Sequence, residues 1–365
     1  MPPLGSLSCL ALRSYRNRCI HSNLFVLNLP GCKPALPKAS LYRKTGTIST
    51  AHVDSREYIG ESGRNYKIER VLQEETFPPR WVGLASAGGR KYVLKYIHPV
   101  NFEDLEDVNN RLRGSANHVR LCQDTIPKKS VFVFEYLADH LLHLVQKDLP
   151  LETTKRILKD ALRGIAELHD QDIVHTADIK ADNFFVDWQT RKDGILIERV
   201  QLGDLEDSAY IPPGSAMIGK QAGNPMWRSP EAHAKGPVNK LSDIFSFALV
   251  CIYAVHKRVI LAVGKEELDE GVDPLSIVIE RQISYFADAD GIAAFLNYLG
   301  DENPWVQVFK IIRDGFDKEN PRKPFSHWKG ADEDFKSLIC SMTNFDPAKR
   351  ITAREALAHK WFEGV

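Results

Sequence analysis

One stretch of the sequence, His175–Asn183, combines side chains suited to handling a phosphate group. Within it, Asp178, Lys180 and Asn183 follow the spacing Asp-x-Lys-x-x-Asn. Transfer of a phosphoryl group needs a carboxylate that accepts the proton of the attacking hydroxyl, a cation near the migrating phosphate, and an oxygen ligand for a metal ion. One loop that carries all three fixes their mutual geometry. The same spacing also arises by chance in many loops, so it needs support from other segments.

A second candidate metal ligand lies downstream, in the segment Leu202–Glu206. A single aspartate at the end of a strand, here Asp204, can bind a magnesium ion that bridges nucleotide phosphates. An isolated aspartate of this kind is more often part of a turn. Other segments of the chain decide between the two interpretations. The informative segments are Gly223–Glu231, Ser242–Phe247 and Phe345–Phe362.

The elements that must position these residues change in type along the chain. Short runs rich in β-branched and aromatic residues predict strands, with Gly88-Gly89 as a hairpin turn. The predicted strands are 66–72, 81–85, 91–97 and 130–137. Phe102–Leu112 is charged with sparse apolar positions and predicts a helix.

Beyond Leu137, helices dominate the prediction. Apolar residues recur at helical spacing from Ile157 to Leu168. Ile244–Val255 is apolar nearly all round, which predicts a helix in the centre of a lobe. A strand-rich lobe followed by a helical lobe is an α+β fold, and ligands usually bind in a cleft of such a molecule.

The order and spacing of these segments resemble the eukaryotic protein kinase family from Tyr66 to Phe362. The resemblance implies a two-lobed fold, with a small β-rich N-terminal lobe at 66–137 and a larger α-helical C-terminal lobe at 138–362. Residues 1–65 are then an N-terminal extension, either disordered or a targeting segment. The Asp-x-Lys form of the loop indicates the serine/threonine type. Together with Trp227–Glu231 it is also similar to the SR-protein-kinase branch.

The resemblance assigns the chemistry to individual side chains. Asp178 is implied as the catalytic base and Lys180 as the cation of the transition state. Asn183 and Asp204 are implied as the magnesium ligands.

The resemblance also implies an ATP site. Lys95 matches the lysine that binds the α- and β-phosphates, and Glu106 is the expected helix carboxylate that pairs with it, with Glu103 as the alternative. Phe134 falls at the gatekeeper position, and Glu135 to Leu137 at the hinge whose backbone meets adenine. Val93 and Phe185 are larger than the usual residues beside adenine, so they either narrow the pocket or pack against each other.

Two further matches are structural. Glu231 and Arg350 are expected to form a buried pair, and Asp243 to brace the backbone of the catalytic loop. Neither the pair nor Asp243 is expected to touch nucleotide.

The sequence departs from the family mainly where backbone groups bind phosphate. The loop at Gln73–Arg80 contains no glycine and has two prolines, so it offers fewer N–H donors. Glu74 and Glu75 repel a nucleotide if they face it, or else point to solvent, with Arg80 in partial compensation. Ala177 is an apparent insertion between His175 and the base. Glu206 stands where the family has glycine, and Asn224 where it has threonine.

These observations predict an ATP-dependent protein serine/threonine kinase with Mg²⁺ as metal and a protein hydroxyl as acceptor. The alternative is a pseudokinase scaffold with weak or absent ATP binding. A small-molecule phosphotransferase is disfavoured, because Ser229–Glu231 and Asp346–Arg350 resemble a platform for protein substrates.

Composition narrows partners and location. The net charge is zero, but residues 1–53 hold seven basic and no acidic residues, which leaves 0 − 7 = −7 on the remainder. An acidic body suits nucleic acid poorly, so no such partner is expected. Six scattered cysteines fit reduced thiols inside a cell. No segment is long and apolar enough to cross a membrane. We expect a monomer in the cytoplasm or nucleus, with a mitochondrial location as the alternative because of the basic N-terminus.

Overall fold

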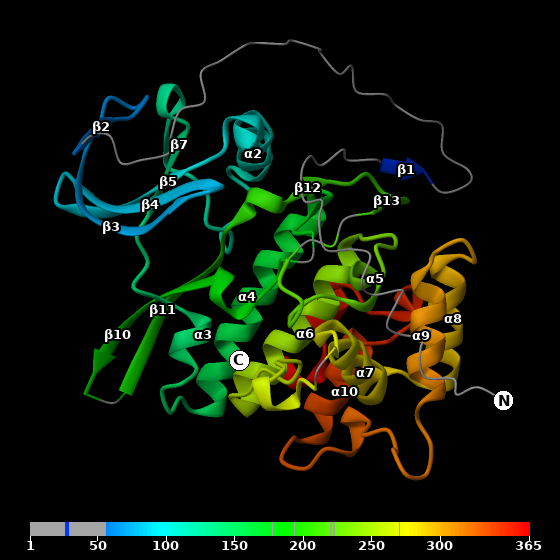
Figure 1. Ribbon diagram of the computed structural model, residues 1–365. Helices are drawn as coiled ribbons and strands as arrows, with labels where there is room; N and C mark the ends of the chain where they lie inside the picture. Colours follow the sequence, from blue (N-terminus) through cyan, green and yellow to red (C-terminus); the bar gives the residue numbers. More distant parts are fainter. Residues whose placement is uncertain are drawn as a thin grey trace. The chain divides into compact units, whose positions relative to one another are not determined.

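The computed structural model describes residues 26–28, 56–176, 178–192, 194–219, 221, 223–269 and 271–365 (Figure 1). Apart from the short strand β1 (Val26–Asn28), they fall into two compact units. The sheet unit contains the described residues of 56–175 and 181–214, together with Val365. The helical unit contains those of 176–180 and 215–364. The expected extension at 1–65 lies largely outside the described residues.

An antiparallel sheet of six strands forms the N-terminal part of the sheet unit, in the order β2-β3-β4-β5-β7-β6. Its strands are β2 (Glu57–Ile59), β3 (Asn65–Thr76), β4 (Pro79–Ala87), β5 (Arg90–Tyr96), β6 (Asp124–Ile126) and β7 (Val131–Glu135). The four predicted strands and the turn at Gly88-Gly89 are therefore present.

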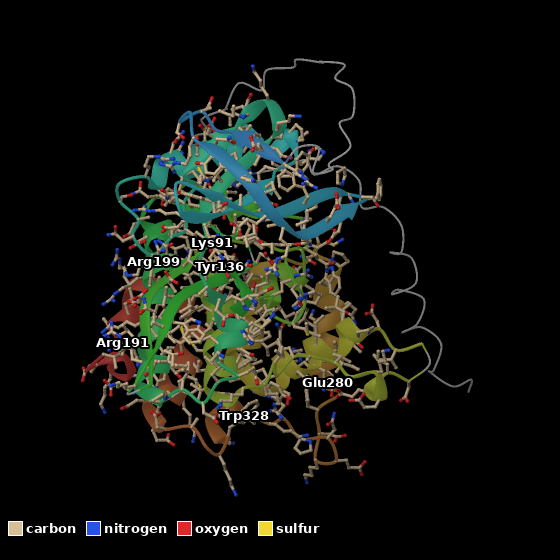
Figure 2. All side chains as sticks on the ribbon, turned by 90° about the vertical axis from the view of Figure 1, so that its left-hand side faces the viewer. Lys91, Tyr136, Arg191, Arg199, Glu280 and Trp328 are labelled. Carbon is tan, nitrogen blue, oxygen red and sulfur yellow. The ribbon has the colours of Figure 1, made fainter. Side chains whose placement is uncertain are left out.

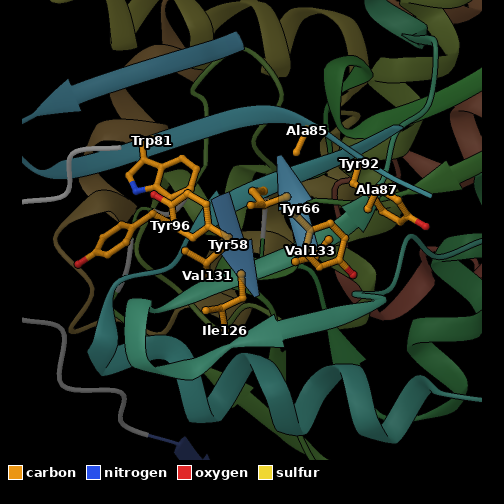
Figure 3. Close-up of a cluster of buried hydrophobic side chains, with 11 residues drawn as sticks. Tyr58, Tyr66, Trp81, Ala85, Ala87, Tyr92, Tyr96, Ile126, Val131 and Val133 are labelled. Carbon is orange, nitrogen blue, oxygen red and sulfur yellow. The ribbon is translucent and has the colours of Figure 1, made fainter. Parts of the chain in front are cut away.

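Strand β5 shows why the sheet has two different faces. Tyr92, Leu94 and Tyr96 are buried, whereas the intervening Val93 and Lys95 are only partly buried. Successive side chains of a strand point to opposite faces. The first set joins an aromatic-rich core cluster with Tyr66 and Trp81 (Figure 3). Val93 and Lys95 are left to the other face.

Helix α2 (Pro99–Leu112) belongs to the sheet unit and packs against its six-stranded sheet. Proline at its first position suits a helix start, since its missing N–H has no partner there anyway. Phe102 packs edge-on against Phe132 of β7, with ring centroids 4.7 Å apart. The predicted helix at Phe102–Leu112 is thus confirmed and starts three residues earlier.

The rest of the sheet unit contains a second hairpin, formed by β10 and β11, and the helices and short strands around it. Helix α4 (Leu151–Asp170) buries the apolar stripe that its sequence predicts and packs against β11. The other elements are β8 (Asp139–His140), α3 (Leu141–Leu144), β9 (Ile173–Val174), β10 (Phe184–Arg191), β11 (Gly194–Leu202) and β12 (Ala209–Tyr210), with 3-10 helices η1 (Pro127–Lys129), η2 (Ala181–Asn183) and η3 (Leu205–Asp207).

The helical unit is built around α6 (Lys240–His256), which is buried on nearly every side, as its apolar run predicted. Asn239 and Ser242 form a capping box at its start. The remaining elements are β13 (Ser215–Met217), α5 (Pro230–His233), α7 (Pro274–Phe286), α8 (Ala289–Leu299), α9 (Trp305–Asp314), α10 (Glu333–Met342) and α11 (Ala353–Leu357), with 3-10 helices η4 (Lys265–Glu267), η5 (Phe325–His327), η6 (Pro347–Lys349) and η7 (Lys360–Phe362).

Two boundaries differ from the sequence prediction. Strand β2 lies inside the segment set aside as an extension, because three residues are too few to show an alternating pattern. Gln73–Arg80 is mostly strand and not loop: β3 and β4 stay paired up to Thr76 and Pro79, and only Phe77 and Pro78 make the turn. Among the described residues, no helix is suited by length and apolarity to cross a membrane.

Candidate nucleotide-binding site

A cavity of about 370 Å³ lies within the sheet unit. Its walls come from the β3–β4 hairpin, β5, α2, Arg120, β7 and the residues after it, β8, η2, β10 and the Asp204–Glu206 segment. Lys95, Asn183 and Asp204 all line it. The three residues that the sequence assigns to phosphate and metal therefore line the same cavity.

Lys95 is held by two carboxylates. Its Nζ lies 2.6 Å from Asp204 Oδ1 and 2.7 Å from Glu206 Oε1. Burial by itself lowers the pKa of this ammonium, but the attraction of Asp204 and Glu206 outweighs it and raises the pKa above its ordinary value. Lys95 is therefore a fixed cation at neutral pH.

The expected partner on the helix is not the observed one. Leu105 and Asn109 of α2 line the cavity, whereas Glu106 does not, and the ion pairs of Lys95 in the described part of the chain are with Asp204 and Glu206. The rotation of α2 explains this. Asn109 is pinned by hydrogen bonds to Leu105 O and from Cys122 N, both at 2.8 Å. Glu106 directly follows Leu105, so its side chain points about 100° away from that of Leu105 around the helix.

Glu206 was expected to be a poor substitute for glycine, because it lacks backbone freedom. The structure shows that Asp204, at φ 60°, takes the left-handed conformation, and Glu206 has no positive φ. The 3-10 helix η3 then turns Glu206 back toward Lys95. Burial raises the pKa of this carboxyl, although Lys95 acts in the opposite direction. Glu206 is a site residue that the sequence does not indicate, because no local pattern shows that its carboxylate reaches Lys95.

The β10–β11 hairpin brings the two candidate metal ligands together. Asn183 directly precedes β10, Asp204 follows β11, and Phe184 pairs with Leu202 across the hairpin. Gly203 N donates to Asn183 O at 2.9 Å, which ties the two segments at that point. Amide and carboxylate oxygens are ligands that Mg²⁺ prefers. The donor set therefore fits the metal that the sequence predicts.

The charged residues of the β3–β4 hairpin differ in whether they line the cavity. Glu74 and Glu75 are exposed and do not line the cavity, whereas Gln73 and Arg80 do. The solvent-facing alternative is thus the one observed. Because the backbone here is paired in a ladder up to Thr76↔Pro79, a side chain, that of Arg80, is the cationic group that the hairpin presents to the cavity.

The cavity is also lined by Val93, Phe134, Tyr136, Leu137 and Phe185. Val93 and Phe185 both line the cavity; whether they narrow it or pack against each other stays a prediction. Glu135 does not line it.

The side chain of Glu135 instead pairs with Arg199, at 2.8 Å between Oε2 and Nη1. Tyr136 N donates to Lys91 O at 3.2 Å. Figure 2 labels Lys91, Tyr136 and Arg199, which gather at this side of the molecule. The expected hinge, Glu135 to Leu137, is therefore fixed by an ion pair at Glu135 and by a backbone hydrogen bond at Tyr136.

Arg120 is the second site residue that the sequence did not indicate. Its Nη2 and Nε donate to the backbone carbonyl of Glu135 at 2.6 and 3.2 Å. The guanidinium carbon lies 4.4 Å from the ring centroid of Phe185 and 5.2 Å from that of Phe134. The residue is only 8 % exposed. Burial lowers its pKa to about 10, so it stays charged at neutral pH.

Asp178 and Lys180 belong to the helical unit. There Lys180 Nζ lies 3.2 Å from Asp178 Oδ2. Arg228 of the same unit has its pKa lowered to about 10 by burial, with the charge of Asp178 acting the other way. Arg228 also donates to Gly223 O at 2.5 Å. The predicted base thus has two cations in its surroundings; the apparent insertion, Ala177, lies outside the described residues.

The expected buried pair is present. Arg350 Nη1 lies 2.7 Å from Glu231 Oε1, and Ser242 Oγ donates to the same carboxylate oxygen at 2.7 Å. Glu231 is 1 % exposed. Burial alone raises the pKa of Glu231, but Arg350 and Ser242 together lower it below its ordinary value. Asp243 is fully buried at the start of α6.

A β-rich N-terminal region, a helical C-terminal region and a cavity that carries Lys95, Asn183 and Asp204 define a two-lobed fold of the protein-kinase type. The protein kinase domain family matches residues 89–362, and the chain belongs to this family.

The individual relatives with similar sequences are also protein kinases. The chain is 23 % identical over 283 residues to a probable serine/threonine-protein kinase PBL4 of Arabidopsis thaliana, covering 73 % of this chain and 59 % of that protein. It is 26 % identical over 359 residues to the serine/threonine-protein kinase SSN3 of Mycosarcoma maydis, covering 91 % and 46 %. It is 26 % identical over 239 residues to cyclin-dependent kinase 4 of Ovis aries, covering 64 % and 68 %.

Among solved structures, a chain in the crystal structure of the yeast RNA Pol II CTD kinase CTDK-1 complex matches with a TM-score of 0.64 at 16 % identity, over 90 % of this chain and 97 % of that one. The likeness at this identity shows the fold alone. Together with the family match, it confirms the two-lobed protein kinase fold that the sequence predicted.

Proposed function

We propose that this chain is an active protein serine/threonine kinase, which transfers the γ-phosphate of a magnesium nucleotide, ATP in the wider family, to a protein hydroxyl. One observation carries the proposal: Lys95, Asn183 and Asp204 line a single cavity, with Lys95 Nζ 2.6 Å from Asp204 Oδ1. The serine/threonine kinases among its relatives support the acceptor type.

In this proposal Lys95 binds the α- and β-phosphates, and Asn183 and Asp204 supply oxygen ligands for the metal. Magnesium, when bound, neutralises charge on the phosphates. Asp178 accepts the proton of the attacking hydroxyl while the new bond to phosphorus forms and the bond to the β-phosphate oxygen breaks. Lys180 stabilises the negative charge on the transferred group.

The helical unit supports a protein as acceptor over a small molecule. Arg228 fastens the segment that begins at Gly223, and Glu231 at its end is anchored to Arg350. Gln282 of α7 adds a further bond, from its Nε2 to Arg228 O at 2.7 Å. A segment fastened at several points is a rigid surface against which an extended peptide can lie.

A pseudokinase scaffold is the second candidate. Three observations favour it. The segment Gln73–Arg80 at the end of the β3–β4 hairpin lacks glycine, two carboxylates already neutralise Lys95, and Arg120 donates hydrogen bonds to the carbonyl of Glu135. Each of these lowers the expected affinity for a nucleotide.

One experiment separates the two candidates. The full 365-residue chain is titrated with nucleoside triphosphates and Mg²⁺ or Mn²⁺ while its thermal unfolding is followed, and labelled phosphate is followed onto a generic basic protein. Ligand at 100 times its Kd stabilises a protein by roughly 2.7 kcal/mol. We expect such a shift, with transfer that disappears in Asp178→Asn. Absence of transfer with every nucleotide and metal supports the scaffold.

The branch and the location have tests of their own. Faster phosphorylation of an Arg-Ser-rich peptide than of the basic protein supports the SR-protein-kinase branch. A tagged fusion of residues 1–53 that stays out of mitochondria supports a cytoplasmic or nuclear location.

A further inference from the structure

Arg120 occupies the place where a kinase hinge offers a hydrogen-bond acceptor to a nucleobase. Two of its N–H groups converge on the carbonyl oxygen of Glu135, at 2.6 and 3.2 Å. A carbonyl oxygen has two lone pairs, so these two bonds use its capacity. The acceptor that adenine would need for its 6-amino group is therefore already taken by the protein itself.

The guanidinium is held firmly in this place. It lies over the ring of Phe185, 4.4 Å from the centroid, and near that of Phe134. Stacking of this kind on an aromatic face is favourable for arginine, particularly where water is excluded. The backbone is fixed as well, since Arg120 N donates to Leu202 O at 2.7 Å. Moving the side chain aside breaks the hydrogen bonds and the stacking together.

The group is also an obligate donor. Arginine carries five N–H bonds and no acceptor, and a pKa of about 10 keeps Arg120 protonated at neutral pH. Within the described residues, the hydrogen bonds of this side chain go to Glu135 O. Its remaining N–H groups belong to a residue that lines the cavity. A ligand in the cavity thus meets a wall that includes the cationic residue Arg120.

We propose that Arg120 sets the base preference of this cavity, so that it favours nucleoside triphosphates whose base carries no hydrogen-bond donor at position 6 of a purine. The 6-amino group of adenine meets the charged donor Arg120 and finds the Glu135 carbonyl occupied, so it loses its hydrogen bond to water without replacement. A base with hydrogen or an acceptor at this position avoids that loss. The proposal rests on nucleotide binding in this cavity and deepens the proposed function by naming the nucleotide.

The cleanest probe is a pair of nucleotides that differ in one group. Purine riboside triphosphate lacks only the 6-amino group of ATP. We expect the full-length wild-type chain, with Mg²⁺, to bind purine riboside triphosphate about tenfold more tightly than ATP in a calorimetric or thermal-shift titration. Inosine triphosphate, with an oxygen at position 6, is the second probe and is also expected to bind more tightly than ATP.

The variant Arg120→Met keeps an apolar stem of similar length, removes every donor and frees the Glu135 carbonyl. We expect it to reverse the preference and bind ATP more tightly than purine riboside triphosphate. The matched control is Arg191→Met, the same change at an exposed position near the tip of the β10–β11 hairpin (Figure 2). It is expected to keep the wild-type order. The wild-type comparison by itself tests the proposal if Arg120→Met does not fold.

The outcomes separate this inference from the proposed function. Tighter binding of ATP by the wild type overturns the inference, and phosphate transfer from ATP in the same sample leaves the proposed function standing. A wild-type preference for purine riboside triphosphate without any phosphate transfer supports the inference and contradicts the proposed function. Absence of binding by every nucleotide overturns both.

Discussion

Lys95 Nζ lies 2.7 Å from Glu206 Oε1, and the same ammonium lies 2.6 Å from Asp204 Oδ1. The charge of the predicted phosphate-binding lysine is thus balanced by one short segment, Asp204–Glu206, and not by the expected carboxylate of α2. The position of Lys95 therefore depends on the conformation of this segment. A rotation of α2, which carries Glu106, does not by itself break the pair.

The first prediction concerns Glu206. The change Glu206→Gln keeps the shape of the side chain but removes its charge. Of the two carboxylates beside Lys95, Asp204 alone then remains ionised. The ammonium then competes more strongly with magnesium for Asp204. We expect kcat/KM for phosphate transfer to fall by roughly tenfold or more, since a charge-assisted hydrogen bond contributes about 1.5–3 kcal/mol. Glu106→Gln is the matched control and should stay within about twofold of wild type. A larger loss in Glu106→Gln than in Glu206→Gln would restore the helix carboxylate as the functional partner.

The second prediction concerns Lys95 itself. Lys95→Met removes the cation and leaves Asp204 and Glu206 facing each other, so the negative phosphates of a nucleotide meet uncompensated carboxylates. We expect nucleotide affinity to drop by at least about tenfold in a calorimetric titration, on the scale of one lost charge-assisted hydrogen bond. Lys91→Met, at an exposed position of the same strand (Figure 2), should leave the affinity unchanged. Equal affinities for the two variants would show that Lys95 does not contact the phosphates.

The third prediction separates binding from chemistry. Asp178→Asn keeps the side chain's size but removes its ability to accept a proton. We expect the rate of transfer to fall by about 10²–10⁴-fold while the Kd for nucleotide changes little. Steady-state transfer and equilibrium titration on the same preparation measure the two quantities. Asp301→Asn, at an exposed residue, is the control. Transfer near the wild-type rate in Asp178→Asn would rule out its role as base.

The fourth prediction concerns stability. Glu231→Gln leaves Arg350 buried without its ionised partner, and breaking a buried pair in this way typically costs about 3–5 kcal/mol of unfolding free energy. Denaturant unfolding at neutral pH measures it. Glu333→Gln removes a charge from the pair with Lys336, where the glutamate side chain is 87 % exposed, and should cost under about 1 kcal/mol. Similar losses in both variants would contradict a buried structural role for Glu231.

The same pair predicts a pH dependence. Because the pKa of Glu231 is lower in the folded state than its ordinary value of 4.5, the folded state favours the ionised form. The stabilisation that ionised Glu231 contributes is fully present above about pH 4.5 and is lost as the pH falls through its folded-state pKa. Denaturant unfolding between pH 3 and 7 should therefore show that the unfolding free energy falls more steeply with decreasing pH for wild type than for Glu231→Gln. Parallel curves would mean that Glu231 does not contribute to the acid limb.

Local sequence patterns were enough to identify strands β3, β4, β5 and β7 and helices α2, α4 and α6. Alternation in β5 and the apolar stripe of α4 each carry their own periodicity, because a strand or helix must bury one side. The family segments added the site residues whose spacing along the chain is short. Asp178 and Lys180 share one loop, and Asn183 and Asp204 flank one hairpin.

The residues that were missed depend on contacts between distant segments. Nothing near Glu206 in the sequence shows that η3 turns its carboxylate to Lys95, and nothing near Arg120 shows that its guanidinium reaches the carbonyl of Glu135. The choice between Glu106 and other partners depended on the rotation of α2, which Asn109 and Cys122 fix across a loop.

The amino-acid sequence by itself therefore determined the family, the change from strands to helices along the chain and the side chains predicted to handle phosphate, because these follow from local periodicity and short spacings. Only the tertiary structure decided which charges pair inside the cavity and what fills its hinge end. Such pairings depend on distances of a few ångströms between segments far apart in the chain, and those distances are set by packing.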